Sequence, residues 1–323
     1  MRVKIFTEAS SMIGFGHAVR CSSLYQELRD RDIQVEYIVN GERSIQSVLP
    51  NIMMTFTNWL DESYLLEHLK DIDYAIVDSY LAPPAIYQLI AERTKSALYI
   101  DDYQRIQYPR GLILNPSPKS EKFEYYQCSK GIKVLTGWKY ILLRSEFLKE
   151  KIREREIENT VLLLLGGTDV LDLASSIAKQ LLEYNPEWHV NVVGSSRKHG
   201  FECSRNITFH GQLAARELKQ LILSNKYMIS AAGQTLFELL YLKKVVLPII
   251  VVKNQKSNFE AFRAVFPEML GIDASINVDS INEIVDVLPI FLSTQYREKF
   301  IKTLTSLVDG LGAKRGIDAL LNL

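Results

Sequence analysis

The sequence predicts an α/β protein made of two Rossmann-like domains, each built on a parallel sheet. Three observations lead to this prediction. Short apolar runs alternate with helix-like segments in the first half, the same alternation restarts at Val161, and a charged stretch lies between the two series. The 323-residue chain is also about twice the usual single-domain length, so each half can bury its own core.

The strand-like runs of the first half are nearly continuous in apolar character, as expected when helices cover both faces of a sheet. They are expected at residues 3–7, 35–39, 75–77, 97–100 and 112–114. Amphipathic segments between several of these runs predict helices at 18–30, 62–70 and 84–94. This order of elements is typical of a parallel sheet.

The second series repeats the pattern, with strands expected at 161–167, 189–194, 207–211 and 227–233 and helices at 171–183 and 213–223. Residues 146–159 are charged and carry almost no large apolar side chain after Leu148, which is typical of an exposed interdomain connection. The boundary is therefore expected near Glu150, giving domains 1–150 and 151–323. The stretch from Ile281 is helix-rich, and its apolar tail can pack on either domain.

The composition limits the classes of binding partner that the chain can be expected to have. With 38 basic and 38 acidic residues the formal net charge is zero, so the chain lacks the basic excess that binds a nucleic acid or an anionic membrane. A small anionic ligand needs only local donors. Three cysteines without a C-x-x-C pair, no secretory signal pattern and no apolar stretch of membrane-spanning length predict a cytoplasmic protein without membrane insertion. The oligomeric state stays open, with a monomer slightly favoured.

The turn after the first strand is the first candidate site. Gly14 and Gly16 permit a tight turn and close approach of a ligand, and the following helix N-terminus favours negative charge. His17 is the candidate general base, because histidine takes a proton near neutral pH. The alternative is that His17 caps the helix or holds the loop. Arg20 suits a phosphate or, equally, a surface carboxylate.

Other strand ends in the first half carry polar groups at the edge where ligands bind in such sheets. Asp78 and Tyr80 follow one strand, and Asn115 follows another, where its amide suits a ligand hydroxyl or its own turn. Asp101 and Asp102 are neighbours on extended chain, which favours helix capping or hydroxyl binding over metal binding. Because the other histidines are scattered as well, no metal site and no cofactor are expected.

The second half contains two small-residue turns that lead into helices, and such helix starts suit a diphosphate. Glu238 suits ribose hydroxyls, although a first-turn glutamate is also common for dipole reasons alone. The chain contains neither a Walker loop nor a G-x-S-x-G motif. The candidate binding residues of this half are Gly167, Thr168, Ala232, Gly233, Gln234, Thr235, Glu238, Asn254, Gln255 and Asn258.

Several motifs occur together and in a fixed order. They are GFGHAVR at 14–20, VDSY at 77–80, IDDY at 100–103, LNPS at 114–117, GWKYILLRSEF at 137–147, LGGTD at 165–169, SAAGQTLFELL at 230–240 and KNQKSN at 253–258. In this combination the chain resembles the UDP-sugar hydrolases of pseudaminic acid biosynthesis and the related spore-coat polysaccharide biosynthesis proteins, from Arg2 to about Phe262. The GGTD and SAAG turns are shared more widely with two-lobed glycosyltransferases of the B type.

The resemblance implies a glycosyltransferase B-type fold and metal-independent hydrolysis of UDP-2,4-diacetamido-2,4,6-trideoxy-β-L-altropyranose to free sugar and UDP. It implies that His17 activates water and that Tyr80 lies beside the reacting centre. It also implies that the SAAGQT turn and Glu238 hold the diphosphate and ribose, with Asn254 and Gln255 in the matching K-N-Q stretch. SAAG stands where the pseudaminate enzymes read S-A-S-S, which leaves the exact sugar open.

Two other functions remain open from the sequence. A glycosyltransferase would use the same donor site and pass the sugar to an acceptor hydroxyl that His17 deprotonates. A non-catalytic subunit that binds sugar nucleotides is the second alternative, and a base placed in the site argues against it.

Overall fold

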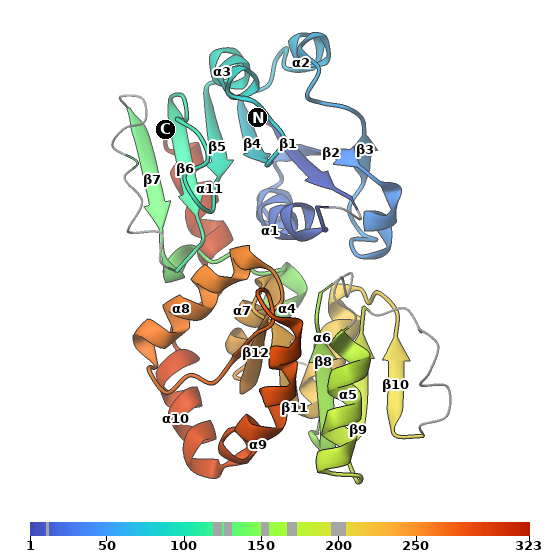
Figure 1. Cartoon of the computed structure of the whole chain (residues 1–323). Coiled ribbons are helices and arrows are strands. Elements are labelled where there is room, and N and C mark those ends of the chain that lie inside the picture. The colour runs from blue at the N-terminus through green and yellow to red at the C-terminus, as the bar shows by residue number, and fades with distance from the viewer. Residues whose placement is uncertain (11–12, 119–124, 126–130, 150–154, 167–172, 195–204) are drawn as a thin grey trace. The chain divides into compact units, whose positions relative to one another are not determined.

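The computed structural model describes residues 1–323 apart from 11–12, 119–124, 126–130, 150–154, 167–172 and 195–204 (Figure 1). The chain divides into two compact units. The first comprises Met1–Leu148 together with Asp309–Leu323, and the second comprises Lys149–Val308. Each unit is built on a parallel sheet with helices around it, which confirms the predicted α/β class with two parallel-sheet domains.

The first unit contains, among the described residues, a seven-stranded sheet in the order β3-β2-β1-β4-β5-β6-β7. All its strand pairs are parallel. The strands are β1 (Arg2–Ala9), β2 (Gln34–Gly41), β3 (Met54–Phe56), β4 (Tyr74–Asp78), β5 (Ser96–Ile100), β6 (Gly111–Asn115) and β7 (Ile132–Thr136). The helices are α1 (Gly16–Asp30), α2 (Glu62–His68), α3 (Pro84–Arg93), α4 (Ser145–Lys149) and α11 (Gly312–Leu321), with short 3-10 turns at η1 (Arg43–Ser47) and η4 (Trp138–Tyr140).

Strand order reverses between β1 and β4. From β1 the chain continues outward to β2 and β3, whereas β4 begins the series that runs the other way to β7. In an open parallel sheet, ligands bind outside the carboxyl ends of the strands at such a reversal. Thr7 and Asp78 are register partners there, so the residues that follow both strands share one edge.

The core of the first unit lies on both faces of its sheet. Leu24 of α1 and Ile317 of α11 belong to one apolar cluster, while Leu65 of α2 and Ile86 of α3 belong to the other. This double covering explains why the strands are nearly continuous in apolar character. The two edge strands β3 and β7 are less buried and were not expected from the sequence.

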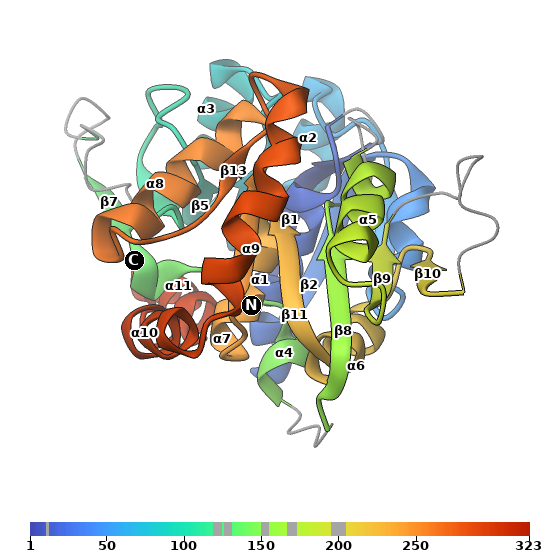
Figure 2. The ribbon, with the colours of Figure 1, turned by 60° about the horizontal axis from the view of Figure 1, so that its bottom comes forward.

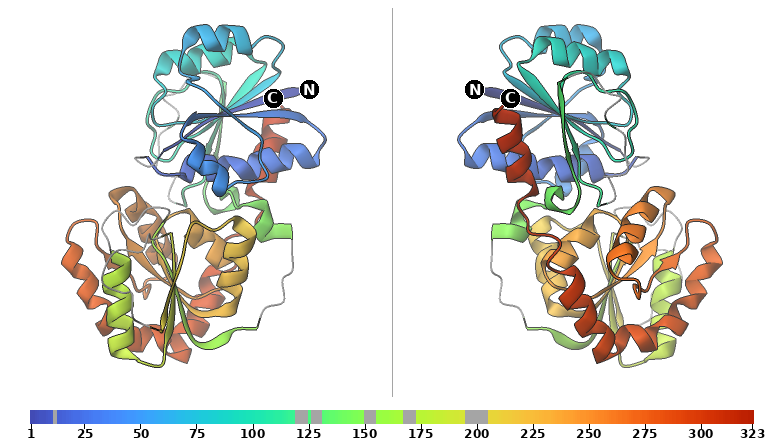
Figure 3. Two further views of the ribbon diagram at one scale, coloured as in Figure 1. Left: turned by 90° about the vertical axis from the view of Figure 1, so that its right-hand side faces the viewer. Right: turned by 90° about the vertical axis from the view of Figure 1, so that its left-hand side faces the viewer.

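The last helix belongs to the first unit, although the expected second domain extended to Leu323. Ala313, Ile317 and Leu320 complete the cluster around α1, and α11 lies beside α1, β5 and β6 (Figure 3). Gly312 and Gly316 permit this packing. A methyl group on Gly312 would lie 2.1 Å from the Ile141 carbonyl oxygen, and one on Gly316 would lie 2.8 Å from Leu114 Cδ1.

The second unit contains, within its described residues, a six-stranded parallel sheet in the order β10-β9-β8-β11-β12-β13. Its strands are β8 (Ile157–Leu164), β9 (His189–Val193), β10 (Ile207–His210), β11 (Asn225–Ala231), β12 (Val246–Ile250) and β13 (Ile272–Asp273). Its helices are α5 (Leu173–Tyr184), α6 (Ala215–Ser224), α7 (Gln234–Tyr241), α8 (Lys256–Val265), α9 (Ile284–Leu292) and α10 (Thr294–Leu304), with 3-10 turns at η5 (Lys253–Gln255) and η6 (Val278–Glu283).

Here the strand order reverses between β8 and β11, and α5 lies against β9 (Figure 2). The turn from Ala232 to Gly233 follows β11 directly and therefore lies at the reversal. None of the helices in the described part of the chain combines the length and apolar character needed to cross a bilayer.

Candidate active site

The loop between β1 and α1 places His17 in the first turn of a helix. Gly14 has a φ of 80°, in the left-handed region that favours glycine, and its N–H donates to the Ser10 carbonyl oxygen at 2.8 Å. The helix N-cap is Phe15, which makes no side-chain capping bond. The His17 ring therefore does not cap the helix but turns toward β4, and only 5% of His17 is exposed.

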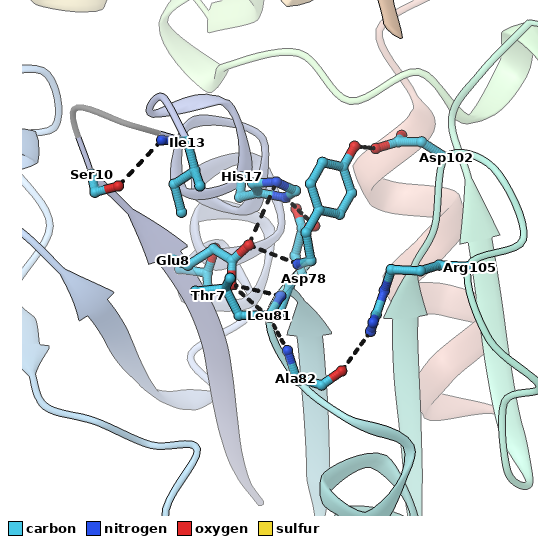
Figure 4. A network of polar contacts seen from close by, with 12 residues as sticks. Thr7, Glu8, Ser10, Ile13, His17, Asp78, Leu81, Ala82, Asp102 and Arg105 are labelled. Atoms are coloured by element: carbon cyan, nitrogen blue, oxygen red, sulfur yellow. Dashed lines mark hydrogen bonds and ion pairs between the residues drawn. The ribbon is translucent and has the colours of Figure 1, made fainter.

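Asp78 at the end of β4 holds that ring. Its Oδ1 atom lies 2.7 Å from His17 Nδ1, and the carboxylate is fully buried (Figure 4). An ionised carboxylate only accepts hydrogen bonds, so we assign the proton to Nδ1 when the ring is neutral. Nε2 then carries the free lone pair, which is the arrangement a general base requires.

Arg20, one turn further along α1, keeps Asp78 ionised. Its Nε donates to Asp78 Oδ2 at 2.6 Å, and its Nη2 donates to Oδ1 at 2.7 Å. Burial by itself would raise the pKa of Asp78, but the charge of Arg20, helped by His17, holds that pKa well below its usual value. Arg20 Nη1 donates to Asp102 Oδ1 at 2.6 Å, so the guanidinium pairs with carboxylates in this structure.

Tyr80 connects Asp102 to the imidazole. Its hydroxyl donates to Asp102 Oδ2 at 2.5 Å, and its ring meets the His17 ring edge to face at a centroid distance of 4.2 Å. Burial, followed by the negative charge of Asp102, raises the pKa of Tyr80 far above its usual value, so the hydroxyl remains a donor. The half-exposed Tyr103 ring lies 5.3 Å from Tyr80, so aromatic side chains extend from His17 toward the surface.

Glu8 is a member of this cluster that sequence reasoning missed. Its side chain is fully buried at the carboxyl end of β1, and Oε1 lies 3.8 Å from His17 Nε2. A charged residue at the carboxyl end of the first predicted strand, beside the expected ligand edge, was the available signal. Within the described residues, no group of three or more His, Cys, Asp or Glu side chains is arranged to hold a metal ion.

Asn115, at the end of β6, contacts Tyr125 and Ser117. The buried amide donates to the Tyr125 hydroxyl at 2.8 Å and accepts from the Ser117 N–H at 2.9 Å. Tyr125 in turn donates to Asp101 Oδ2 at 2.6 Å. Asn115 thus holds its own turn here, one of the two roles considered from the sequence, and ligand binding by Asn115 stays a prediction.

The second unit gathers part of its predicted set around the start of α7. Gly233 is the N-cap, and Gln234 and Thr235 begin the helix. Asn258 Nδ2 donates to the Ala232 carbonyl oxygen at 3.0 Å, and Gln255 Oε1 accepts from the Val251 N–H at 2.9 Å. α8 therefore braces the turn that precedes α7, while Gln255 holds the segment between β12 and η5.

The remaining predicted residues of this unit differ in setting. Glu238 is fully buried one turn into α7, whereas Asn254 is exposed on η5. Gly167 and Thr168 lie outside the described residues. The binding roles expected of all these residues stay predictions.

The sequence was compared with protein-family models and with curated proteins. No protein-family model matches the sequence. The Helicobacter pylori protein named pseudaminic acid cytidylyltransferase and UDP-2,4-diacetamido-2,4,6-trideoxy-β-L-altropyranose hydrolase is 26% identical, over 84% of this chain and 48% of that protein. The Campylobacter jejuni protein named for the hydrolase alone is 24% identical, over 80% of this chain and 94% of its own length. Homologues of this chain carry the predicted hydrolase name.

An uncharacterised protein of Methanocaldococcus jannaschii is 23% identical over 81% of this chain and 57% of its own length. This chain thus spans about half the length of the archaeal and Helicobacter relatives.

Solved structures with the same architecture are enzymes of the glycosyltransferase B type and their neighbours. A spinosyn rhamnosyltransferase matches with a TM-score of 0.66 at 13% identity, with 100% of both chains covered. A UDP-GlcNAc 2-epimerase from Neisseria meningitidis matches with a TM-score of 0.62 at 14% identity, again over 100% of both chains. At such identities the likeness shows the fold alone, and it confirms the predicted fold type.

Proposed function

We propose that this chain is an enzyme that processes UDP-linked sugars, and that it hydrolyses a UDP-linked diacetamido-trideoxy sugar to free sugar and UDP. The observation that carries the proposal is the buried His17–Asp78 pair, with Nδ1 2.7 Å from Oδ1. A proton on Nδ1, the assignment that an ionised partner favours, leaves Nε2 as the acceptor. The relatives' names support the reaction class. The Campylobacter protein, covered over 94% of its length, bears the hydrolase name without the cytidylyltransferase name.

His17 supplies the base in the proposed mechanism. Nε2 takes a proton from water while the water oxygen forms a bond to the anomeric carbon. The bond between that carbon and the phosphate oxygen breaks, and its electron pair leaves with UDP. Asp78 keeps the ring oriented and stabilises the imidazolium that forms, as the buried carboxylate of a catalytic triad does. Because UDP is a good leaving group, positioned water and one base suffice.

The diphosphate is proposed to bind the second unit at the start of α7. The N–H groups that point out of a helix N-terminus, together with the helix dipole, favour a phosphate there. Gly233 carries no side chain to block the approach, and Asn258 braces the preceding residue through the Ala232 carbonyl oxygen. Glu238 is proposed to accept from the ribose, and the substrate is proposed to be the small-molecule partner of the chain.

The test is to incubate the purified chain with UDP-linked diacetamido sugars in the absence of an acceptor and to follow UDP release. We expect turnover with wild type and near-complete loss with His17→Asn, because Asn retains polarity but cannot act as the base. Substrate binding by calorimetry is expected to persist. His68→Asn changes a histidine that contacts Tyr64 on α2, and it serves as the matched control with normal turnover.

Reaction in ¹⁸O-labelled water identifies the bond that breaks. Attack at the anomeric carbon leaves the released UDP free of label, whereas attack at phosphorus places ¹⁸O in UDP. Unchanged turnover in His17→Asn removes the histidine from the mechanism. Release of UDP that requires an added sugar acceptor assigns the chain to the glycosyltransferases instead.

A further inference from the structure

Glu8 places a second carboxylate beside the catalytic ring. Its Oε1 lies 3.8 Å from His17 Nε2, while Asp78 Oδ1 lies 2.7 Å from Nδ1. Both carboxylates are fully buried, and they come from the adjacent strands β1 and β4 (Figure 4). The imidazole of His17 is therefore flanked by negative charge at both of its nitrogens.

The charge on Glu8 is not offset by the hydrogen bonds that it accepts, since these come from neutral groups. Oε1 accepts from the Tyr80 N–H at 2.7 Å, and Oε2 accepts from the Ser79 hydroxyl at 2.6 Å and the Leu81 N–H at 3.4 Å. Arg20 instead contacts Asp78 and Asp102. A buried carboxylate is costly without a positive partner, and a proton on Nε2 would supply one.

The geometry points to Glu8 as a positioning residue that stabilises the proton His17 takes from water, an inference that rests on the proposed hydrolysis. In that step the water O–H bond breaks, the proton moves to Nε2, and the positive ring forms between two carboxylates. The attraction acts most strongly on the charged ring, which exists after the proton has moved, so it lowers the barrier to the reaction.

The alternative is that Glu8 only anchors the loop that presents Tyr80. Two variants separate these roles. Glu8→Gln keeps the shape and one acceptor oxygen but removes the charge. Ser79→Ala keeps the Glu8 charge but removes one neutral donor to Oε2. It also removes the acceptor for the N–H groups of Leu81 at 3.0 Å and Ala82 at 2.9 Å, which loosens the same loop.

The first measurement needs no substrate. ¹⁵N NMR spectra of the histidine rings are recorded on the full chain at one fixed pH near neutrality, and His17→Asn identifies the His17 signals. The groups that face the ring are Glu8 from β1, Asp78 from β4, Tyr80 from the loop after β4, and Arg20 from α1, whose Nη2 lies 3.3 Å from Nδ1. We expect the doubly protonated fraction of the ring to fall in Glu8→Gln and to stay near wild type in Ser79→Ala.

The second measurement is UDP release. Glu8→Gln is expected to lower kcat by about ten- to a hundredfold with little change in KM, and Glu8→Asp is expected to recover part of the loss. An unchanged protonated fraction in Glu8→Gln, or equal kcat losses in Glu8→Gln and Ser79→Ala, overturns the inference. If wild type releases no UDP while the spectra change as expected, the hydrolysis fails and the role of Glu8 in stabilising the protonated ring stands.

Discussion

A single buried carboxylate organises the chemistry at the residue scale. Asp78 binds the imidazole of His17 and the guanidinium of Arg20, which lie about one helical turn apart on α1. The same guanidinium continues to Asp102, and Asp102 accepts from the Tyr80 hydroxyl. The ring orientation is thus set by a chain of charged hydrogen bonds, which are stronger and more directional than neutral ones.

The depressed pKa of Asp78 leads to a prediction about acid stability. A carboxyl whose folded-state pKa lies below its unfolded value of about 3.9 stabilises the fold above that pH, and the stabilisation disappears as the pH falls toward the folded value. Asp78→Asn is therefore expected to cost the first unit about 3–5 kcal/mol above pH ~5, because Arg20 loses its buried partner. The difference from wild type should shrink below pH ~4.

Urea denaturation of both proteins between pH ~3 and ~7, followed by circular dichroism, measures this difference. Asp286→Asn, at an exposed position on α9, is the control and should change little at any of these pH values. A stability difference that is the same at the acid end as at neutral pH contradicts the coupling of Asp78 to Arg20.

Tyr80 combines a ring contact with a hydroxyl contact, and substitution can separate them. Tyr80→Phe keeps the ring against His17 but removes the donor to Asp102. Because a hydrogen bond to a charged group is worth about 1.5–3 kcal/mol, we expect UDP release to fall by about tenfold or more. Tyr80→Ala should lose more. Equal rates for wild type and Tyr80→Phe in a UDP-release assay would show that only the ring matters.

Much of the first-unit cluster could be predicted from the sequence, because the carboxyl ends of parallel strands converge. His17, Asp78, Tyr80 and Asp102 follow three strands of one sheet, and the structure brings them together. Glu8 was missed because alternation along a strand does not distinguish a buried carboxylate from an exposed one at the strand end. The contacts of Asn115 depend on Tyr125, whose approach no local pattern predicts.

At the scale of elements, the start of α11 is limited by space against the segment around η4. The position that a Cβ on Gly312 would take lies 2.1 Å from the Ile141 carbonyl oxygen, a backbone atom that cannot rotate away. Gly312→Ala is therefore expected to lower the stability of the first unit by about 1–3 kcal/mol, although alanine normally favours a helix.

Thermal melting of Gly312→Ala beside Gly211→Ala tests this expectation. An added methyl group at Gly211 meets nothing within 4 Å, so it controls for the loss of glycine flexibility alone. A melting temperature of Gly312→Ala at or above that of wild type would mean that the helix shifts without cost.

Edge elements were the hardest to predict. β3 has three residues, and β7 reads IKVLT, where a lysine interrupts the apolar run. Such strands gain little from burial on their own, and pairing with β2 or β6 decides that they form. Central strands need no such help, and those predicted for the first sheet agree with β1, β2, β4, β5 and β6 to within a few residues.

At the scale of the whole molecule, the first unit is assembled from both ends of the chain. The apolar pattern of a helix does not show which of two cores the helix packs against. The sequence therefore left open which domain the final segment joins. The structure selects the cluster around α1, where Ile317 and Leu320 are fully buried. Residues far apart in sequence thus complete one core, a pairing that local periodicity cannot reveal.

This arrangement predicts how fragments behave. Residues 149–308 are expected to fold as an isolated fragment, whereas 1–148 should melt at a lower temperature than 1–148 joined by a flexible linker to 309–323. Each large apolar side chain that α11 buries contributes about 1.5–3 kcal/mol. Melting curves of the three fragments decide the matter, and equal stability of the two first-unit fragments would contradict the assigned role of α11.

Both termini in one unit make the other unit a single uninterrupted insertion. A recombination event that replaces one continuous stretch of coding sequence, 149–308, would exchange that whole unit. The first unit, with α1, β4 and α11, would remain unchanged. Exchange of the first unit alone would require two separate stretches, 1–148 and 309–323, to be replaced together. Recombination can therefore exchange the unit proposed to bind the nucleotide by replacing one stretch, whereas the unit that carries His17 requires the replacement of two.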